Sequence, residues 1–231
     1  MDTITLEVAD GTKMQTYVAR PQVAPQKGII VVQEAFGVND YMKRTTQRFA
    51  PNGFLAIAPE MFHRSAPAGF EAAYTDYPSI QPHMRALTLE GQSADLKTCF
   101  DWLVAQGVPA NKIAVIGFCM GGRVAFLANA DLPLAASVSF YGGGIMQTLS
   151  ERVSDLHAPQ LLVWGGKDGH ILPEQTRALA DALVAAGKPF IEATFSEAGH
   201  GFACDARESY HAPSAKVAFA LADAFLAEHL I

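Results

Sequence analysis

Residues 113–122 read IAVIGFCMGG, an apolar run that leads into a glycine-rich turn. Its first four residues form a continuous apolar, mostly β-branched run, which is typical of a strand buried on both faces. Glycines then stand on both sides of Cys119, and residues 121–130 follow with helical spacing. A Gly-x-Cys-x-Gly pattern between a strand and a helix predicts a nucleophile elbow, a sharp turn that presents its central side chain. The alternative is a buried structural cysteine in a glycine-rich turn.

The rest of the chain repeats the alternation of strand and helix. Apolar runs predict further strands at residues 29–32, 54–58, 136–140, 161–164 and, more weakly, 190–195. Helical spacing predicts helices at residues 41–50, 87–104, 121–130, 173–186 and 214–230. This order predicts an α/β fold with a mostly parallel central sheet and helices on both faces. Alternating apolar residues around Asp10-Gly11 predict a β-hairpin before it.

We expect a single domain over residues 1–231, because no repeat, low-complexity tract or linker divides the chain. Residues 60–81 are the exception to the pattern, since they contain prolines and aromatic residues without a clear period. A loop of this length inside a compact domain is usually functional, but a meandering surface connection is equally compatible with the sequence.

Composition narrows the class of protein. The chain of 231 residues is 50% hydrophobic and 17% charged, so it can bury a large core and is not expected to be disordered. Its formal net charge of −6 gives no basic field for nucleic acid. No apolar run is long enough for a membrane span, and no signal peptide is visible. We therefore expect a cytoplasmic protein that binds neither nucleic acid nor membrane.

The three cysteines do not form a disulfide or metal framework. Cys99, Cys119 and Cys204 are odd in number and far apart, and no Cys-x-x-Cys pair occurs. The histidines have no recognisable metal-ligand spacing, and neither a GxGxxG nor a Walker-type loop is present. The sequence therefore predicts no metal and no cofactor, and it predicts reduced thiols.

Two polar residues follow later strands in the order that a nucleophile elbow requires. Asp168 lies in the turn after the predicted strand 161–164, and His200 follows the strand 190–195. A histidine there would take the thiol proton from Cys119, and the aspartate would orient the imidazole. The helix after Cys119 directs its positive end at the sulfur and favours the thiolate.

The predicted strand 29–32 ends in QEAFG, residues 33–37. In folds with such an elbow, this strand exit and the residue after the nucleophile supply the two N–H groups of an oxyanion hole. That assigns the backbone of Ala35 and Met120. Glu34 is unexpected beside a site that must stabilise negative charge. The alternative interpretation is that Glu34 is a loop carboxylate exposed to solvent.

Together these motifs resemble the dienelactone hydrolase (carboxymethylenebutenolidase) family of α/β-hydrolases. The resemblance runs from Gly28 to about Leu226 and includes the segments QEAFGVN, GFCMGG, GGKD and AGHGF, at residues 33–39, 117–122, 165–168 and 198–202. It implies a Cys119–His200–Asp168 triad. It also implies that Glu34 pairs with Cys119 at rest and helps to activate it when substrate binds.

The resemblance also implies a substrate site, and this chain differs from the family at one position of that site. Its expected lining residues are Phe36, Arg85, Tyr141, Gly201, Phe202 and Cys204. The best-known members carry a carboxylate-binding arginine where this chain has Cys204; the nearest arginine is Arg207. A second family arginine has no secure counterpart, and Arg85 and Arg64 are candidates. The loss of a bidentate clamp weakens the case for a carboxylate-bearing substrate.

The sequence thus favours a hydrolase of a lactone or small activated ester, such as the cleavage of a carboxymethylenebutenolide to maleylacetate. A general carboxylesterase or thioesterase of the same fold is one alternative, and a non-catalytic ligand-binding protein on the hydrolase scaffold is another. The expected partner is a small-molecule substrate, and the expected assembly is a monomer or small homo-oligomer.

Overall fold

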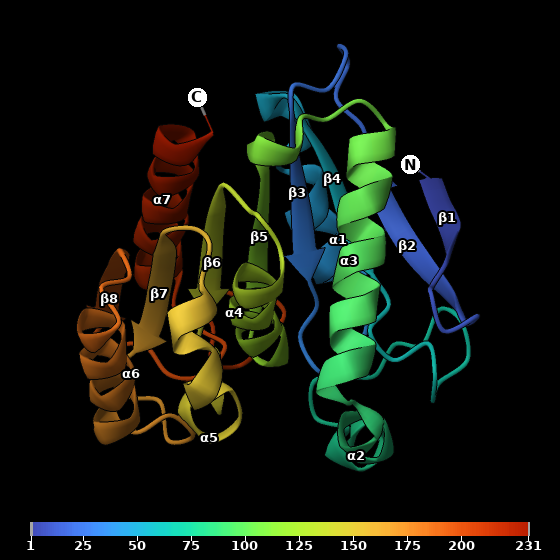
Figure 1. The fold of residues 1–231 in the computed structure, drawn as a ribbon. Coiled ribbons are helices and arrows are strands. Elements are labelled where there is room, and N and C mark those ends of the chain that lie inside the picture. The colour runs from blue at the N-terminus through green and yellow to red at the C-terminus, as the bar shows by residue number, and fades with distance from the viewer. Residues whose placement is uncertain (1, 231) are drawn as a thin grey trace. The chain divides into compact units, whose positions relative to one another are not determined.

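The computed structural model describes residues 2–230, so the two end residues of the predicted 1–231 domain lie outside it. By their internal contacts the residues fall into two compact units, one ending at Ala114 and the other starting at Val115. The described residues contain eight strands with helices between most of them (Figure 1). The predicted mixed α/β class is therefore confirmed.

The first unit holds the hairpin and the first parallel pair of strands. Its strands are β1 (Asp2–Glu7), β2 (Lys13–Ala19), β3 (Lys27–Val32) and β4 (Phe54–Pro59), in the order β1-β2-β4-β3. Leu6 lies opposite Met14 in the antiparallel pair β1–β2, as the alternation predicts, and Ile29 lies beside Ala56 in the parallel pair β3–β4. The helical segments are α1 (Asp40–Gln47), η1 (Ala50–Asn52), α2 (Tyr77–Ala86), α3 (Leu89–Ala105) and η2 (Ala110–Lys112).

The second unit is built around parallel strands. They are β5 (Ile113–Phe118), within which the unit boundary falls, β6 (Ala136–Phe140), β7 (Gln160–Gly165) and β8 (Phe190–Phe195), in the order β5-β6-β7-β8. β7 pairs in parallel with β6 and with β8, so the carboxyl ends of these strands share one edge. The helical segments are α4 (Met120–Asp131), α5 (Ile145–Leu149), η3 (Ser150–Asp155), α6 (Pro173–Ala185) and α7 (Ala212–His229).

The structure differs from the sequence-based predictions at two helices. The predicted irregular segment 60–81 runs into α2, which begins at Tyr77 because the Asp76 side chain caps it by accepting from Ser79 N–H. The sequence shows no helical periodicity there, because the helix contains prolines at positions 78 and 82. The predicted helix 41–50 ends at Gln47 instead. Pro51 has no N–H for the Gln47 carbonyl, and only a single 3₁₀ turn follows.

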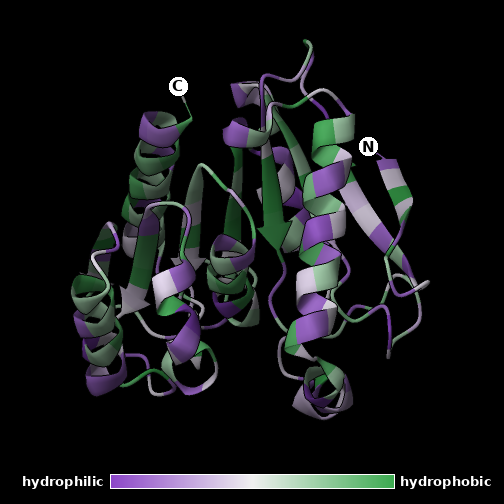
Figure 2. Ribbon diagram, viewed as in Figure 1, coloured by the Kyte–Doolittle hydropathy of each residue, from purple (hydrophilic) through white to green (hydrophobic). Residues whose placement is uncertain are grey.

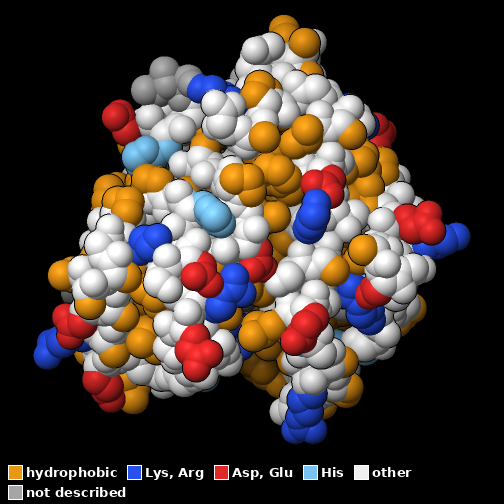
Figure 3. All heavy atoms as spheres, viewed as in Figure 1, with side chains coloured by type: hydrophobic (Ala, Val, Ile, Leu, Met, Phe, Trp, Pro, Cys, Tyr) orange, Lys and Arg blue, Asp and Glu red, His pale blue; other side chains and the backbone are white. Residues whose placement is uncertain are grey.

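Burial separates the strands as their sequences suggest. Every residue of β4, β5, β6 and β7 is buried, whereas β8 is largely half-buried or exposed, in keeping with its weaker apolar run. Figure 2 shows β3 as a hydrophobic strand and α3 with alternating hydrophilic and hydrophobic bands. On the face drawn in Figure 3, basic and acidic side chains are interspersed. Within residues 2–230, none of the helices is both long and apolar enough to cross a membrane.

Candidate active site

Cys119 occupies the sharp turn that the sequence predicts between β5 and α4. Its φ of 54° and ψ of −117° lie in a region that residues with a side chain rarely adopt. The turn is held by hydrogen bonds from Cys119 N–H to the Phe140 carbonyl (3.0 Å) and from Gly122 N–H to the Cys119 carbonyl (2.9 Å). Such strain at a nucleophilic side chain is typical of a functional site.

The flanking glycines are required by the close approach of strand, turn and helix. A Cβ at Gly117 would overlap the carbonyl oxygen of Gly121. A Cβ at Gly122 would stand 2.7 Å from the Phe140 carbonyl oxygen and 2.8 Å from Cα of Gly142. Both distances are shorter than any real Cβ contact, so larger residues would force the elbow apart.

His200 connects the sulfur to the carboxylate within the second unit. It lies in the turn after β8, and its Nε2 is 3.1 Å from Cys119 Sγ. Its Nδ1 is 2.8 Å from Oδ2 of Asp168, which follows β7. The structure therefore brings the three residues together in the geometry of a nucleophile, a base and an orienting acid.

Asp168 is fixed by its own loop. Its Oδ1 accepts hydrogen bonds from the backbone N–H groups of His170 (2.8 Å) and Ile171 (3.1 Å), which leaves Oδ2 directed at His200. The side chain is only 1% exposed. Burial raises the pKa of Asp168, but the hydrogen bonds and the charge of His200 outweigh it and lower that pKa below its ordinary value.

The same pairing acts on His200. Burial, the largest single influence, lowers the pKa of the imidazole. The hydrogen bonds and negative charges of Asp168 and Cys119 together exceed that influence and raise the pKa from 6.5 to about 10. The pairing with Asp168 and Cys119 therefore favours the protonated form of the imidazole.

Aromatic rings surround the imidazole. The Tyr141 ring is 5.2 Å from the His200 ring and 5.6 Å from Phe202, and the His170 ring is 5.3 Å from His200. Tyr141 is fully buried and has a φ of 39°, the second left-handed non-glycine residue in the described chain. Of the expected substrate-site residues, Tyr141, Gly201 and Phe202 thus lie beside the histidine.

Two further expected residues lie near the same turn. Cys204 is fully buried, and its N–H donates to the carbonyl of Gly201. Arg207 lies against Gly201, because a Cβ at position 201 would overlap its guanidinium. Arg207 is the arginine nearest in sequence to the position of the family's carboxylate-binding arginine. It therefore lies beside Gly201, the residue that follows His200.

The expected residues of the first unit cluster at the end of β3. Glu34 is fully buried, and Ala35 is 5% exposed. Phe36 packs against the Tyr74 ring at 4.8 Å and the Tyr77 ring at 5.8 Å. The segment before α2 thus covers Phe36, since Ala72 N–H also donates to the Phe36 carbonyl.

The two arginine candidates of this unit differ in their surroundings. Arg85 is exposed at the end of α2, with Nη2 3.4 Å from the Gln81 side chain. Arg64 forms two hydrogen bonds with Asp95, both 2.8 Å, and a third with Asp10. Because Asp95 is fully buried, Arg64 anchors residues 60–81 to α3.

Sequence reasoning missed Arg123 and His170. Arg123 is the fourth residue of α4, and His170 supplies both a backbone donor to Asp168 and a ring beside His200. Two signals in the sequence could have indicated them: Arg123 is four residues after Cys119, and His170 is two residues after Asp168.

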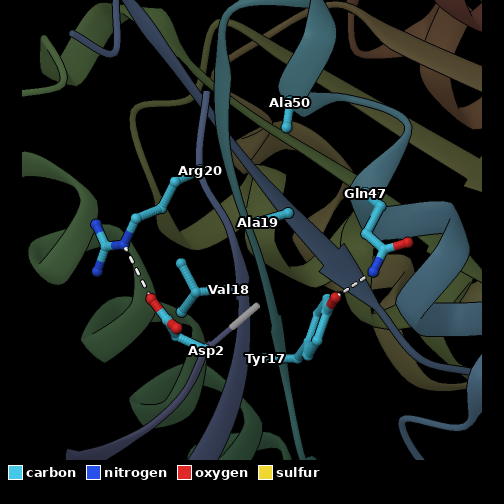
Figure 4. A pocket seen from close by; sticks show the side chains of 7 residues that line it. All are labelled: Asp2, Tyr17, Val18, Ala19, Arg20, Gln47 and Ala50. Atoms are coloured by element: carbon cyan, nitrogen blue, oxygen red, sulfur yellow. Dashed lines mark hydrogen bonds and ion pairs between the residues drawn. The ribbon is translucent and has the colours of Figure 1, made fainter. Parts of the chain in front are cut away.

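The first unit also has a hollow of its own, drawn in Figure 4. Its lining residues are Asp2, Tyr17, Val18, Ala19, Arg20, Gln47 and Ala50. Arg20 Nε is 3.6 Å from Asp2, and the Gln47 amide donates to the Tyr17 hydroxyl. This hollow contains neither thiol nor imidazole. Residues 2–230 also contain no group of three or more His, Cys, Asp and Glu side chains that could hold a metal ion.

Comparison with known proteins decides the family. The model of the dienelactone hydrolase family matches residues 14–230. The chain belongs to the dienelactone hydrolase family. A Yersinia pestis protein named "Putative carboxymethylenebutenolidase" is 36% identical over 90% of this chain and 81% of its own. The Pseudomonas putida "Carboxymethylenebutenolidase" is 29% identical, with 93% and 91% covered.

A solved structure agrees with these relatives. The crystal structure of a "Putative Dienelactone Hydrolase" from Klebsiella pneumoniae has a TM-score of 0.88 and 32% identity, and 98% of each chain is covered. The predicted α/β-hydrolase fold is therefore confirmed, and the chain is a hydrolase of a family that acts on small molecules.

Proposed function

We propose that this dienelactone hydrolase family member cleaves a lactone or small activated ester through Cys119, His200 and Asp168. The observation that carries the proposal is the position of His200 between the sulfur and the carboxylate, at 3.1 and 2.8 Å. The strained turn at Cys119 supports it, because backbone strain is typical of functional residues, and the pKa of about 10 for His200 supports it, because it favours the protonated imidazole beside the sulfur.

In the first chemical step the Cys119 thiolate attacks the carbonyl carbon, and the carbonyl electron pair moves onto oxygen. The N–H groups of Ala35 and Met120 hold that oxyanion in our proposal. Met120 is the first residue of α4, where N–H groups lack intrahelical acceptors. When the tetrahedral intermediate collapses, the carbon–oxygen bond to the leaving group breaks, and the leaving oxygen takes a proton from His200.

In the second step His200, now neutral, removes a proton from water. The hydroxide attacks the thioester carbon, the carbon–sulfur bond breaks and the Cys119 thiolate returns beside protonated His200. An enol lactone suits this cycle, because its enolate leaves without a strong acid. The carboxymethylenebutenolide cleaved to maleylacetate is the substrate that the family relationship favours.

Glu34 has a separate role in the proposal. Its fully buried carboxylate follows β3, beside the proposed oxyanion donor Ala35. We infer that it pairs with Cys119 at rest and takes part in activating Cys119 when substrate binds. The remaining proposed binding residues are Phe36, Arg85, Tyr141, Gly201, Phe202 and Cys204. Since the nucleophile is a thiol, a reducing compartment such as the cytoplasm suits the activity.

The test measures hydrolysis by Cys119→Ala across charged and neutral lactones and aryl esters, including a dienelactone and p-nitrophenyl acetate. We expect turnover to fall to background, whereas Cys99→Ala retains it, because Cys99 is a fully buried thiol whose pKa is raised by burial. Undiminished turnover by Cys119→Ala would overturn the proposal. A wild-type protein that binds the lactone without cleaving it would favour the scaffold alternative.

A further inference from the structure

Arg123 is a half-buried cation whose side chain has no acidic partner among residues 2–230. Its Nε atom is buried without a hydrogen-bond acceptor, and no carboxylate of residues 2–230 forms an ion pair with it. Burial lowers the pKa of its guanidinium, and the negative charge that opposes this is Cys119. A guanidinium carries five donors, so leaving it unpaired is costly unless an anion completes it.

Arginines elsewhere in the chain show the contrast. Arg64 is bound by Asp95 and Asp10, and Arg152 is bound by Asp131 and Asp155. These guanidiniums hold the fold together. Arg123 makes no comparable contribution to the fold, although it stands on the helix that begins at the nucleophile.

The side chain of Arg123 lies along the glycine turn after β6. A Cβ at Gly144 would be 3.5 Å from Nη1 of Arg123 and 3.8 Å from its Cδ. A Cβ at Gly143 would be 3.4 Å from the side chain of Ile171, whose N–H holds Asp168. The guanidinium therefore borders a turn without side chains, next to the loop that positions the triad.

We propose that Arg123 is the anion-binding residue of this active site and receives a carboxylate of the substrate. The inference rests on the proposed function, because it specifies the substrate class as an anionic lactone or ester. It accounts for Cys204, a fully buried thiol where the better-known relatives have an arginine. The cation is supplied by α4 instead, from the same helix that presents the nucleophile.

The experiment compares two alkylating agents of similar size, iodoacetate and neutral iodoacetamide. In both reactions the Cys119 sulfur forms a bond to the methylene carbon, and iodide leaves. Cys99 and Cys204 are fully buried, whereas Cys119 is partly exposed, so the stoichiometric reaction reports Cys119. Peptide mass spectrometry verifies the modified residue.

In Arg123→Gln we expect the rate with iodoacetate to fall about 10- to 100-fold more than the rate with iodoacetamide, the range of a charge-assisted hydrogen bond. Arg123→Lys keeps the charge and retains part of the preference. Arg177→Gln removes an exposed arginine of α6 and leaves both rates unchanged. The ratio of the iodoacetate rate to the iodoacetamide rate, divided by that of free cysteine, is therefore about 10- to 100-fold higher in the wild type than in Arg123→Gln.

Equal losses with both reagents would overturn the proposal, since Arg123 would then act only on the thiolate. Unchanged rates would overturn it as well. Neither alkylation involves ester hydrolysis, so the result does not depend on the hydrolysis test. A charge preference without any turnover would sink the proposed hydrolase activity and leave the anion site standing.

Discussion

The pairing of His200 makes the stability of the protein depend on pH. The pKa of this imidazole is about 10 in the folded protein, against an ordinary value of 6.5. Below pH 6.5 the imidazole is protonated in both states, and the pairing stabilises the fold fully. Between pH 6.5 and 10 the unfolded chain releases a proton that the folded protein keeps, so the stabilisation declines as pH rises.

The size of the decline follows from the same pKa. Each pH unit in this interval removes up to about 1.4 kcal/mol, which amounts to at most about 5 kcal/mol by pH 10. His200→Gln cannot ionise and lacks this dependence. We therefore expect the difference in unfolding free energy between wild type and His200→Gln to be largest at pH 6.5 and to shrink steadily toward pH 9.5.

Urea unfolding at pH 6.5, 7.5, 8.5 and 9.5, with a reductant present, measures this difference. The exposed Val184 provides the control, because it has no ionisable group and wild type and Val184→Ala should differ by the same amount at each pH. A difference for His200→Gln that stays constant, or grows with pH, would refute the pairing of His200 with Asp168 and Cys119.

Three substitutions test other parts of the structure. Asp168→Asn removes the charge facing His200 but keeps the side-chain shape, so kcat for p-nitrophenyl acetate should fall about 10³- to 10⁴-fold in initial-rate assays. Gly122→Ala would place a Cβ 2.7 Å from the Phe140 carbonyl, and urea unfolding should show a loss of about 1–3 kcal/mol. Asp95→Asn deprives Arg64 of its buried carboxylate and should cost about 2–3 kcal/mol, less than a fully buried pair because that guanidinium is partly exposed.

Matched variants make these results interpretable. Gly169→Ala meets no atom within 4 Å, and Asp101→Asn breaks only an exposed pair with Lys97. Each should change stability by less than about 1 kcal/mol. A loss as large as that of the corresponding test variant would contradict our account of the elbow or of the Arg64 anchor. Retention of full activity by Asp168→Asn would contradict the orienting role of the carboxylate.

The elbow and the alternation of strands and helices along the chain could be predicted because their causes are local. The run 113–116 is apolar enough to identify a buried strand, and the glycines around Cys119 are there because backbone atoms approach where side chains would stand. The positions of Asp168 and His200 after later strands can also be read directly from the sequence. Parallel pairing of β6, β7 and β8 then brings those loops to one edge.

The features that could not be predicted depend on contacts between distant residues. Prolines in α2 obscured the helix, and only the side-chain cap at Asp76 reveals why it starts there. The Arg64–Asp95 anchor joins residues 31 positions apart. Arg123 differs because no carboxylate in the described part of the chain pairs with it, and a sequence cannot show which arginines pair with a carboxylate.

Identifying the residue that carries the acyl group during turnover tests directly whether Cys119 is the nucleophile. Wild-type protein mixed with p-nitrophenyl acetate and quenched in acid within the first turnover should carry one acetyl group, as a thioester on the peptide containing Cys119. The amount should match a burst of p-nitrophenol, and Asp168→Asn should form it more slowly. Turnover without an acyl group on Cys119, or with the group on another residue, would contradict the proposal.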